Sequence, residues 1–215
     1  GMYLLLRYLS CEKYSSIIGL HPTTTMMGSR GCPYKCGFCF KTPSDKKYRV
    51  RAVESIVDEI EHLINNYNLK EVMFYDDLMP KDYARSLSNE IIRRNVKIKW
   101  QTPQRVNLVD RDLLELMAKA GCHILRFGVE QGDESMMSFV EKKTNLPLVK
   151  KAFKGAKEVG IDTFAYFIIG YIYENENTMH KTIDMAIEID PRYVMFTKAV
   201  PLPSTPLMRQ CVEEG

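Results

Sequence analysis

The sequence lacks any long hydrophobic run. No uninterrupted apolar stretch reaches the roughly 18 residues that a transmembrane helix requires, so we expect no membrane span. The opening MYLLLRYLS is too short for a signal peptide and has no small-residue cleavage site. A large charge of one sign is also missing. The formal net charge of +3 is too small to favour nucleic acid or an anionic membrane as a partner.

Cysteine pairs typical of a disulfide framework are missing as well. Three of the six cysteines fall within residues 31–40. The other three stand alone: Cys11, Cys122 and Cys211. This distribution in a chain of 215 residues predicts a metal site in a reducing compartment, and we expect the protein in the cytoplasm.

The sequence does contain a regular alternation of strand and helix patterns. Its length of 215 residues suits one main core. Strands are expected at 23–29, 71–75, 97–101, 123–130, 161–170 and 193–200. Helices are expected at 52–67, 80–95, 110–121, 146–160 and 175–190, with a short helix near 133–140 and a last one beginning at 206. The alternation predicts an α/β fold with a parallel sheet, either open and doubly wound or an incomplete barrel.

We interpret residues 1–22 as a lead-in, a remnant of a linker from an upstream domain, and residues 23–215 as the barrel domain. The abrupt ending within the sixth unit suggests a barrel truncated in its last helix.

The segment GCPYKCGFCF, residues 31–40, carries cysteines spaced C-x3-C-x2-C directly after the first expected strand. Loops at the carboxyl ends of parallel strands are where such folds place their chemistry. A structural zinc site and a ferredoxin cluster both need four ligands. Three cysteines would leave one iron of a cluster open, which favours catalysis. An iron–sulfur module for binding or electron transfer, and a zinc-stabilised domain, are the alternatives.

The motif CPYKCGFC is similar to the hallmark of the radical S-adenosylmethionine (SAM) enzymes, and the resemblance extends from about residue 23 to 210. It implies a partial (β/α)6 barrel. The segments SRGCPYKCGFC, FYDDLM, MAKAGCHILRFGVEQGDE and VPLPSTPL resemble the branch that often carries a cobalamin-binding domain upstream, which includes methyltransferases, methylthiotransferase-like enzymes and cyclases. Two stretches depart from that family by losing glycines: GYIYENE at 170–176 and PSTP at 203–206.

The resemblance implies that Cys32, Cys36 and Cys39 ligate a 4Fe–4S cluster whose fourth iron binds SAM. Reductive cleavage of SAM would then give a 5′-deoxyadenosyl radical that abstracts hydrogen from an unknown substrate, for methyl transfer or cyclisation. Such chemistry implies an electron donor such as flavodoxin or ferredoxin. Cobalamin would enter through a domain outside this sequence.

The resemblance also implies roles for further residues beside the cysteines and at the strand ends. Phe38 is expected near the adenine, or else as core filling. Asp76 and Asp77 would bind the methionine ammonium group, with only one facing the site, or else cap the following helix. Glu130 is expected at the ribose or the substrate, or else as a solvated acid. Ile168 and Gly170 are expected at the adenine, with an ordinary turn glycine as the alternative for Gly170. Gln101 and Arg105 are expected at the cofactor carboxylate or the substrate.

Overall fold

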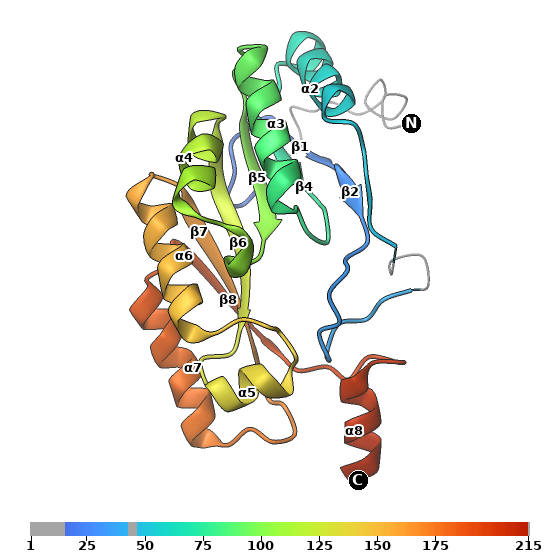
Figure 1. Cartoon of the computed structure of the whole chain (residues 1–215), viewed down its shortest axis with the longest axis vertical. Coiled ribbons are helices and arrows are strands. Elements are labelled where there is room, and N and C mark those ends of the chain that lie inside the picture. Colours follow the sequence, from blue (N-terminus) through green and yellow to red (C-terminus); the bar gives the residue numbers. More distant parts are fainter. Residues whose placement is uncertain (1–15, 43–46, 215) are drawn as a thin grey trace.

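The computed structural model of the chain describes residues 16–42 and 47–214. Within these residues a single curled sheet contains six parallel strands in the order β1-β4-β5-β6-β7-β8. The strands are β1 (Thr23–Met26), β4 (Glu71–Phe74), β5 (Lys99–Gln104), β6 (Cys122–Glu130), β7 (Asp162–Ile169) and β8 (Tyr193–Lys198). The expected partial (β/α)6 barrel is therefore confirmed (Figure 1).

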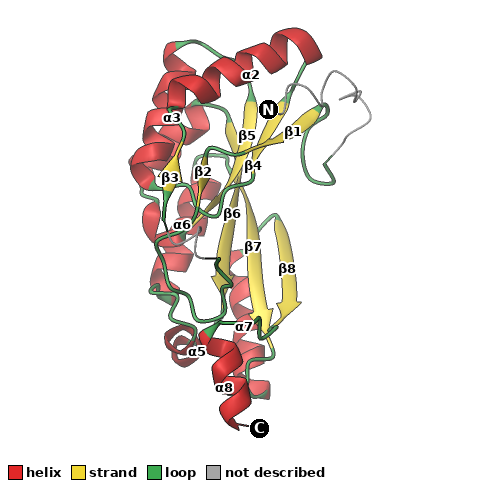
Figure 2. Cartoon of the chain, turned by 90° about the vertical axis from the view of Figure 1, so that its right-hand side faces the viewer, coloured by secondary structure: helices red, strands yellow, loops and turns green. Residues whose placement is uncertain are grey.

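Helices follow the strands along the chain, and most of them line one side of the sheet (Figure 1). They are α2 (Val53–Tyr67), α3 (Lys81–Arg93), α4 (Arg111–Lys119), α5 (Glu134–Phe139), α6 (Leu146–Glu158), α7 (Glu176–Ile189) and α8 (Pro206–Glu214), with a short 3₁₀ helix η3 (Val106–Leu108). Figure 2 shows the opposite face of the sheet, which the helices leave open along β6, β7 and β8.

Apolar spacing explains how each helix packs. In α2 the residues Ile56, Val57, Ile60 and Leu63 recur at helical intervals, and all four are fully or almost fully buried. Side-chain caps fix where later helices begin: Asp110, Asn145 and Asn175 each accept a hydrogen bond from a backbone N–H in the first turn. Most helices and strands thus share one core, and a second, smaller apolar cluster involves α5 and α8.

Several expected boundaries are wrong in ways that affect the site. The first strand ends at Met26, not at 29, because Ser29–Arg30 forms β2 and pairs antiparallel with β3 (Arg49–Val50). The third strand runs over Lys99–Gln104 instead of 97–101, so Gln101 lies inside it rather than after it. The second strand ends at Phe74, so Asp76 and Asp77 lie in a loop and not in a pleated segment.

Parts of the sequence predictions lie outside the described residues. They include most of the expected lead-in at 1–22, with Cys11. In the described ranges, no helix combines the length and apolar character needed to cross a membrane.

Candidate active site

The three-cysteine loop follows β1 and β2 and is held by backbone hydrogen bonds to distant parts of the chain. The Cys39 N–H donates to the Cys36 carbonyl (3.1 Å), which closes a turn around the last two cysteines. Gly37 between them donates to the carbonyl of Val140 and accepts from the N–H of Leu207, each at 3.0 Å. The end of α5 and the start of α8 therefore fix the loop from both sides.

Two cations lie against this loop. The Lys41 ammonium donates to the Cys32 carbonyl (2.9 Å) and to the Tyr34 carbonyl. The Arg105 guanidinium stacks 3.8 Å from the centre of the Tyr34 ring and donates to the Cys36 sulfur at 3.6 Å.

The donor set fits an iron–sulfur cluster better than a single ion. Cys32 and Cys36 are half-buried and Cys39 is exposed, so all three thiols are open to an entering group. In the part of the chain that the structure describes, no three His, Cys, Asp or Glu side chains converge on one point. A structural zinc ion needs four converging ligands, whereas a cluster takes each thiolate on a separate iron.

Asp76 and Asp77 both hold the segment that leads into the cysteine loop. Asp76 accepts the N–H of Gly28 (2.8 Å), and Asp77 accepts the N–H of Gly31 (2.9 Å). Asp76 is buried, and this burial raises the pKa of its carboxyl group. Neither residue caps the next helix, because α3 has Pro80 at its N-cap with no side-chain cap. The helix-cap interpretation is therefore wrong.

Glu130 ends β6 and forms a buried ion pair with Lys142. The Glu130 carboxylate lies 2.7 Å from the Lys142 ammonium, and both side chains are only 9% exposed. Glu130 is thus not a solvated loop acid. Gly128 makes room for the pair, since a Cβ there would meet the Glu130 carboxylate at 2.2 Å and the Lys142 ammonium at 2.8 Å. The Lys142 ammonium also lies 6.0 Å from the centre of the Phe38 ring.

A small apolar cluster supports the loop near its last cysteine. Phe38 and Ile168 pack against buried Tyr171, and the Phe38 and Tyr171 rings meet edge to face at 6.4 Å. The Tyr171 hydroxyl is buried without a hydrogen-bond partner. Gly170 adopts φ +87°, and both it and Tyr171 donate their N–H groups to the Glu174 carboxylate. Phe38, Ile168 and Gly170 are thereby brought to one side of the cysteine loop.

The two departures from the family pattern still form ordered turns. In the first, Glu174 supplies the acceptor for the backbone of Gly170 and Tyr171. In the second, Ser204 adopts φ +66°, the left-handed conformation that glycine favours. Thr205 then accepts the Met208 N–H at 3.1 Å in the first turn of α8. Side chains thus replace the missing glycines in shaping both turns.

Gln101 is not brought to the cysteine loop. Its amide donates to the Glu71 carboxylate (2.7 Å), and Glu71, at the start of β4, is fully buried. The Glu71 carboxylate also lies 2.7 Å from the His123 imidazole and accepts the Leu20 N–H at 2.6 Å. Gln101 therefore belongs to a polar network toward the amino end of the sheet, whereas its predicted partner Arg105 reaches the cysteines.

This network should make stability depend on pH. Burial alone would raise the pKa of Glu71, but hydrogen bonds from His123 and Gln101 outweigh it and lower the pKa below 4.5. A folded-state pKa below the unfolded value stabilises the fold above about pH 4.5 and loses that effect as pH falls. We expect Glu71→Gln to lower the free energy of unfolding by about 2 kcal/mol at pH 7.

Urea unfolding of the wild-type chain and Glu71→Gln from pH 7 to 3 measures this dependence. The difference in free energy of unfolding between the wild type and Glu71→Gln should become smaller below about pH 4.5, where the wild-type carboxylate takes up a proton. A difference in free energy of unfolding that stays constant from pH 7 to 3 would contradict the lowered pKa of Glu71.

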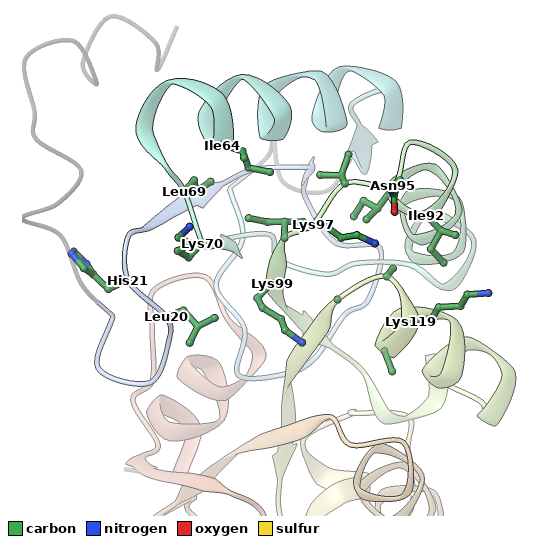
Figure 3. Close-up of a pocket in the computed structure, with 16 residues that line it drawn as sticks. Leu20, His21, Ile64, Leu69, Lys70, Ile92, Asn95, Lys97, Lys99 and Lys119 are labelled. Atoms are coloured by element: carbon green, nitrogen blue, oxygen red, sulfur yellow. The ribbon is translucent and has the colours of Figure 1, made fainter.

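A cavity of about 760 Å³ lies at the amino end of the sheet (Figure 3). Its floor is apolar, with Ile64, Leu69 and Ile92, and lysines lie around it: Lys70, Lys97, Lys99 and Lys119. These residues precede strands or end helices, so they lie at the end of the sheet opposite the cysteine loop. The cavity is therefore separate from the candidate active site.

Sequence reasoning missed Lys142, Tyr34 and Tyr171 as neighbours of the cysteines. Lys142 follows a short helix in EKKTN, where a lysine ordinarily indicates a solvated loop. The only signal for Tyr34 was its position inside the motif. Tyr171 belongs to GYIYENE, the stretch that departs from the family pattern, and that departure was the available signal.

Comparison with known proteins agrees with this geometry. Residues 26–186 match the family model of the radical SAM superfamily, and the chain belongs to that superfamily. It is 32% identical to an uncharacterized methyltransferase of Pyrococcus horikoshii, over 89% of this chain and 42% of the relative. It is 31% identical to the anaerobic magnesium-protoporphyrin IX monomethyl ester cyclase of Cereibacter sphaeroides, over 85% and 31% of the two chains.

Among solved structures, the fold resembles that of the radical SAM methyltransferase TsrM from Kitasatospora setae, which was determined with cobalamin and a 4Fe–4S cluster bound. The TM-score is 0.78 at 21% identity, covering 88% of this chain and 36% of TsrM. The chain therefore spans less than half the length of each of these three proteins.

Proposed function

We propose that the chain is the catalytic barrel of an enzyme that cleaves SAM reductively and uses the resulting radical on a substrate. One observation carries the proposal: three thiols on one loop lie at the carboxyl end of a parallel partial barrel in a radical SAM superfamily member. When bound, a 4Fe–4S cluster supplies the electron that breaks a carbon–sulfur bond of SAM to give a 5′-deoxyadenosyl radical.

In this proposal Cys32, Cys36 and Cys39 hold the cluster. Arg105 and Lys41 fix the loop and place positive charge beside it. The elements α5 and α8 keep the loop in place through Gly37.

The SAM molecule would lie against the surrounding strand ends. Phe38, Ile168 and Gly170 are assigned to the adenine, and Glu130 to the ribose, with Lys142 orienting its carboxylate. Asp76 and Asp77 are assigned to the methionine ammonium group through charge-assisted hydrogen bonds. Gln101 receives no role at SAM, because its amide is engaged by Glu71. These groups would also exclude water from the reacting atoms.

The relatives support methyl transfer or cyclisation as the overall reaction. The structurally similar TsrM carries cobalamin, and we propose that a cobalamin-binding part of the complete protein serves this barrel (residues 23–215) in the same way. A reductant such as flavodoxin or ferredoxin would supply the electron. The cysteine usage supports a reducing compartment such as the cytoplasm.

Anaerobic reconstitution with iron and sulfide tests the proposal. The chain should bind about four irons and, after reduction, convert SAM to 5′-deoxyadenosine and methionine. A cluster without SAM cleavage would favour the electron-transfer alternative, and zinc in place of iron would favour the structural one. Either outcome would contradict the enzyme assignment.

A further inference from the structure

Tyr171 is a buried tyrosine whose hydroxyl has no hydrogen-bond partner in the described part of the chain. The residue is only 4% exposed, and it belongs to a small apolar cluster with Val140 and Leu207. Its ring meets the rings of Phe38 and Phe139 edge to face, at centre-to-centre distances of 6.4 and 6.0 Å. A hydroxyl buried in such surroundings destabilises the fold until an acceptor reaches it.

The same apolar cluster holds the cysteine loop in place. The Gly37 N–H donates to the Val140 carbonyl, and the Leu207 N–H donates to the Gly37 carbonyl, each at 3.0 Å. Val140 and Leu207 both pack in the cluster that contains Tyr171. Phe38, whose ring contacts Tyr171, immediately precedes the last cysteine of the loop. Tyr171 therefore lies against the segment that carries two of the three thiols.

Three acidic groups lie close enough to affect the Tyr171 hydroxyl. Burial raises the pKa of this phenol, and the negative charges that Glu130, Glu174 and Cys36 carry when ionised raise it further, so the hydroxyl keeps its proton and acts as a donor. Glu130 is paired with Lys142 at 2.7 Å. Glu174 accepts the backbone N–H of Tyr171 at 3.0 Å. The Cys36 sulfur is the group of these three that would belong to a bound cluster, whose sulfurs accept hydrogen bonds.

We propose that the Tyr171 hydroxyl donates a hydrogen bond to the iron–sulfur cluster beside Cys36 and thereby raises the reduction potential of the cluster. The inference rests on the proposed function and extends it to the control of the electron-accepting step. A hydrogen bond to a cluster sulfur stabilises the reduced state, because that state carries the larger negative charge. Tyr171 belongs to GYIYENE, a stretch in which this chain departs from the family pattern.

The reduction potential of the reconstituted cluster, measured by a spectroscopic redox titration without SAM, tests the proposal. Tyr171→Phe removes the hydroxyl and keeps the ring, and it should lower the potential. The expected change is about tenfold in the equilibrium constant for one-electron reduction, or about 59 mV. Tyr173→Phe is the matched control, because Tyr173 is 50% exposed and its hydroxyl donates to Glu214. The control should keep the wild-type potential.

Thermal unfolding with and without the cluster gives a second measurement. Without iron the buried hydroxyl has no acceptor, so Tyr171→Phe should raise the Tm by about 3 °C. With the cluster bound, the variant should lose this advantage, because the wild-type hydroxyl then has its acceptor. A role in packing alone would change the Tm equally in both states and would overturn the inference.

The remaining outcomes separate this inference from the proposed function. An unchanged potential in Tyr171→Phe overturns the inference, and a tenfold weaker binding of SAM in equilibrium dialysis would then show that the hydroxyl contacts SAM instead. A chain that binds no cluster overturns both the inference and the proposed function. A chain whose potential depends on Tyr171 but that does not cleave SAM contradicts the proposed function alone.

Discussion

Replacing Cys36 with alanine is expected to abolish SAM cleavage, lowering 5′-deoxyadenosine formation by roughly a thousandfold or more because the cofactor carries the chemistry. The physical reason is the ligand count. The loop offers three thiolates to a cluster, so the loss of one leaves the cluster with too few protein ligands. The Cys36 sulfur is also the one that Arg105 contacts at 3.6 Å. The same loss is expected for Cys32→Ala and Cys39→Ala. Bound iron, the optical absorption of the cluster and 5′-deoxyadenosine are the quantities to measure.

Cys122→Ala is the matched control for the loss of a thiol. Cys122 begins β6 and is 3% exposed, at the end of the sheet away from the cysteine loop. Its replacement should leave iron content and cleavage at the wild-type level. SAM cleavage that persists in Cys36→Ala would show that cleavage does not depend on this loop.

The second large effect is expected on stability. Lys142→Met should lower the free energy of unfolding by about 3 kcal/mol, because it leaves the buried Glu130 carboxylate without its partner. The double variant Glu130→Gln/Lys142→Met should recover most of that loss, since it removes both charges together. Chemical denaturation at pH 7 compares the variants through their midpoints.

Lys143→Met serves as the control for Lys142→Met. Lys143 is the next residue and is exposed, so its replacement should change the free energy of unfolding by less than about 0.5 kcal/mol. If Lys142→Met is equally mild, the Glu130–Lys142 pair does not hold the site in the folded chain.

The alternation of apolar patterns was enough to predict most of the fold. Strand and helix periods indicated six parallel units, and the structure contains these six strands in sequence order across the sheet. The errors occurred at boundaries. Residues 27–29 were predicted as a continuation of the first strand, but Ser29–Arg30 pairs instead with Arg49–Val50. A strand pattern does not reveal its partner, so the turn into β2 could not be foreseen.

The candidate site, like the fold, was predicted only in part. The cysteine spacing pointed to the loop that we propose binds iron, because ligand spacing within eight residues is a local property. Asp76 and Asp77 were placed correctly near that loop, but their partners, the Gly28 and Gly31 N–H groups, depend on how β1 meets β4. Gln101 was assigned from an incorrect strand end, and the structure gives it Glu71 as its partner.

The sequence by itself was enough to predict the class of fold and to single out the three thiols, because hydrophobic periodicity and cysteine spacing are local properties of the chain. Only the tertiary structure decided which charges are paired. Glu130 pairs with Lys142, whereas Arg126, four residues earlier on the same strand, donates a hydrogen bond to the Phe74 carbonyl. The burial and the ion pairing of a charged side chain depend on segments that are far apart in the sequence and meet in the fold. Those contacts determine how much each charge stabilises or destabilises the protein.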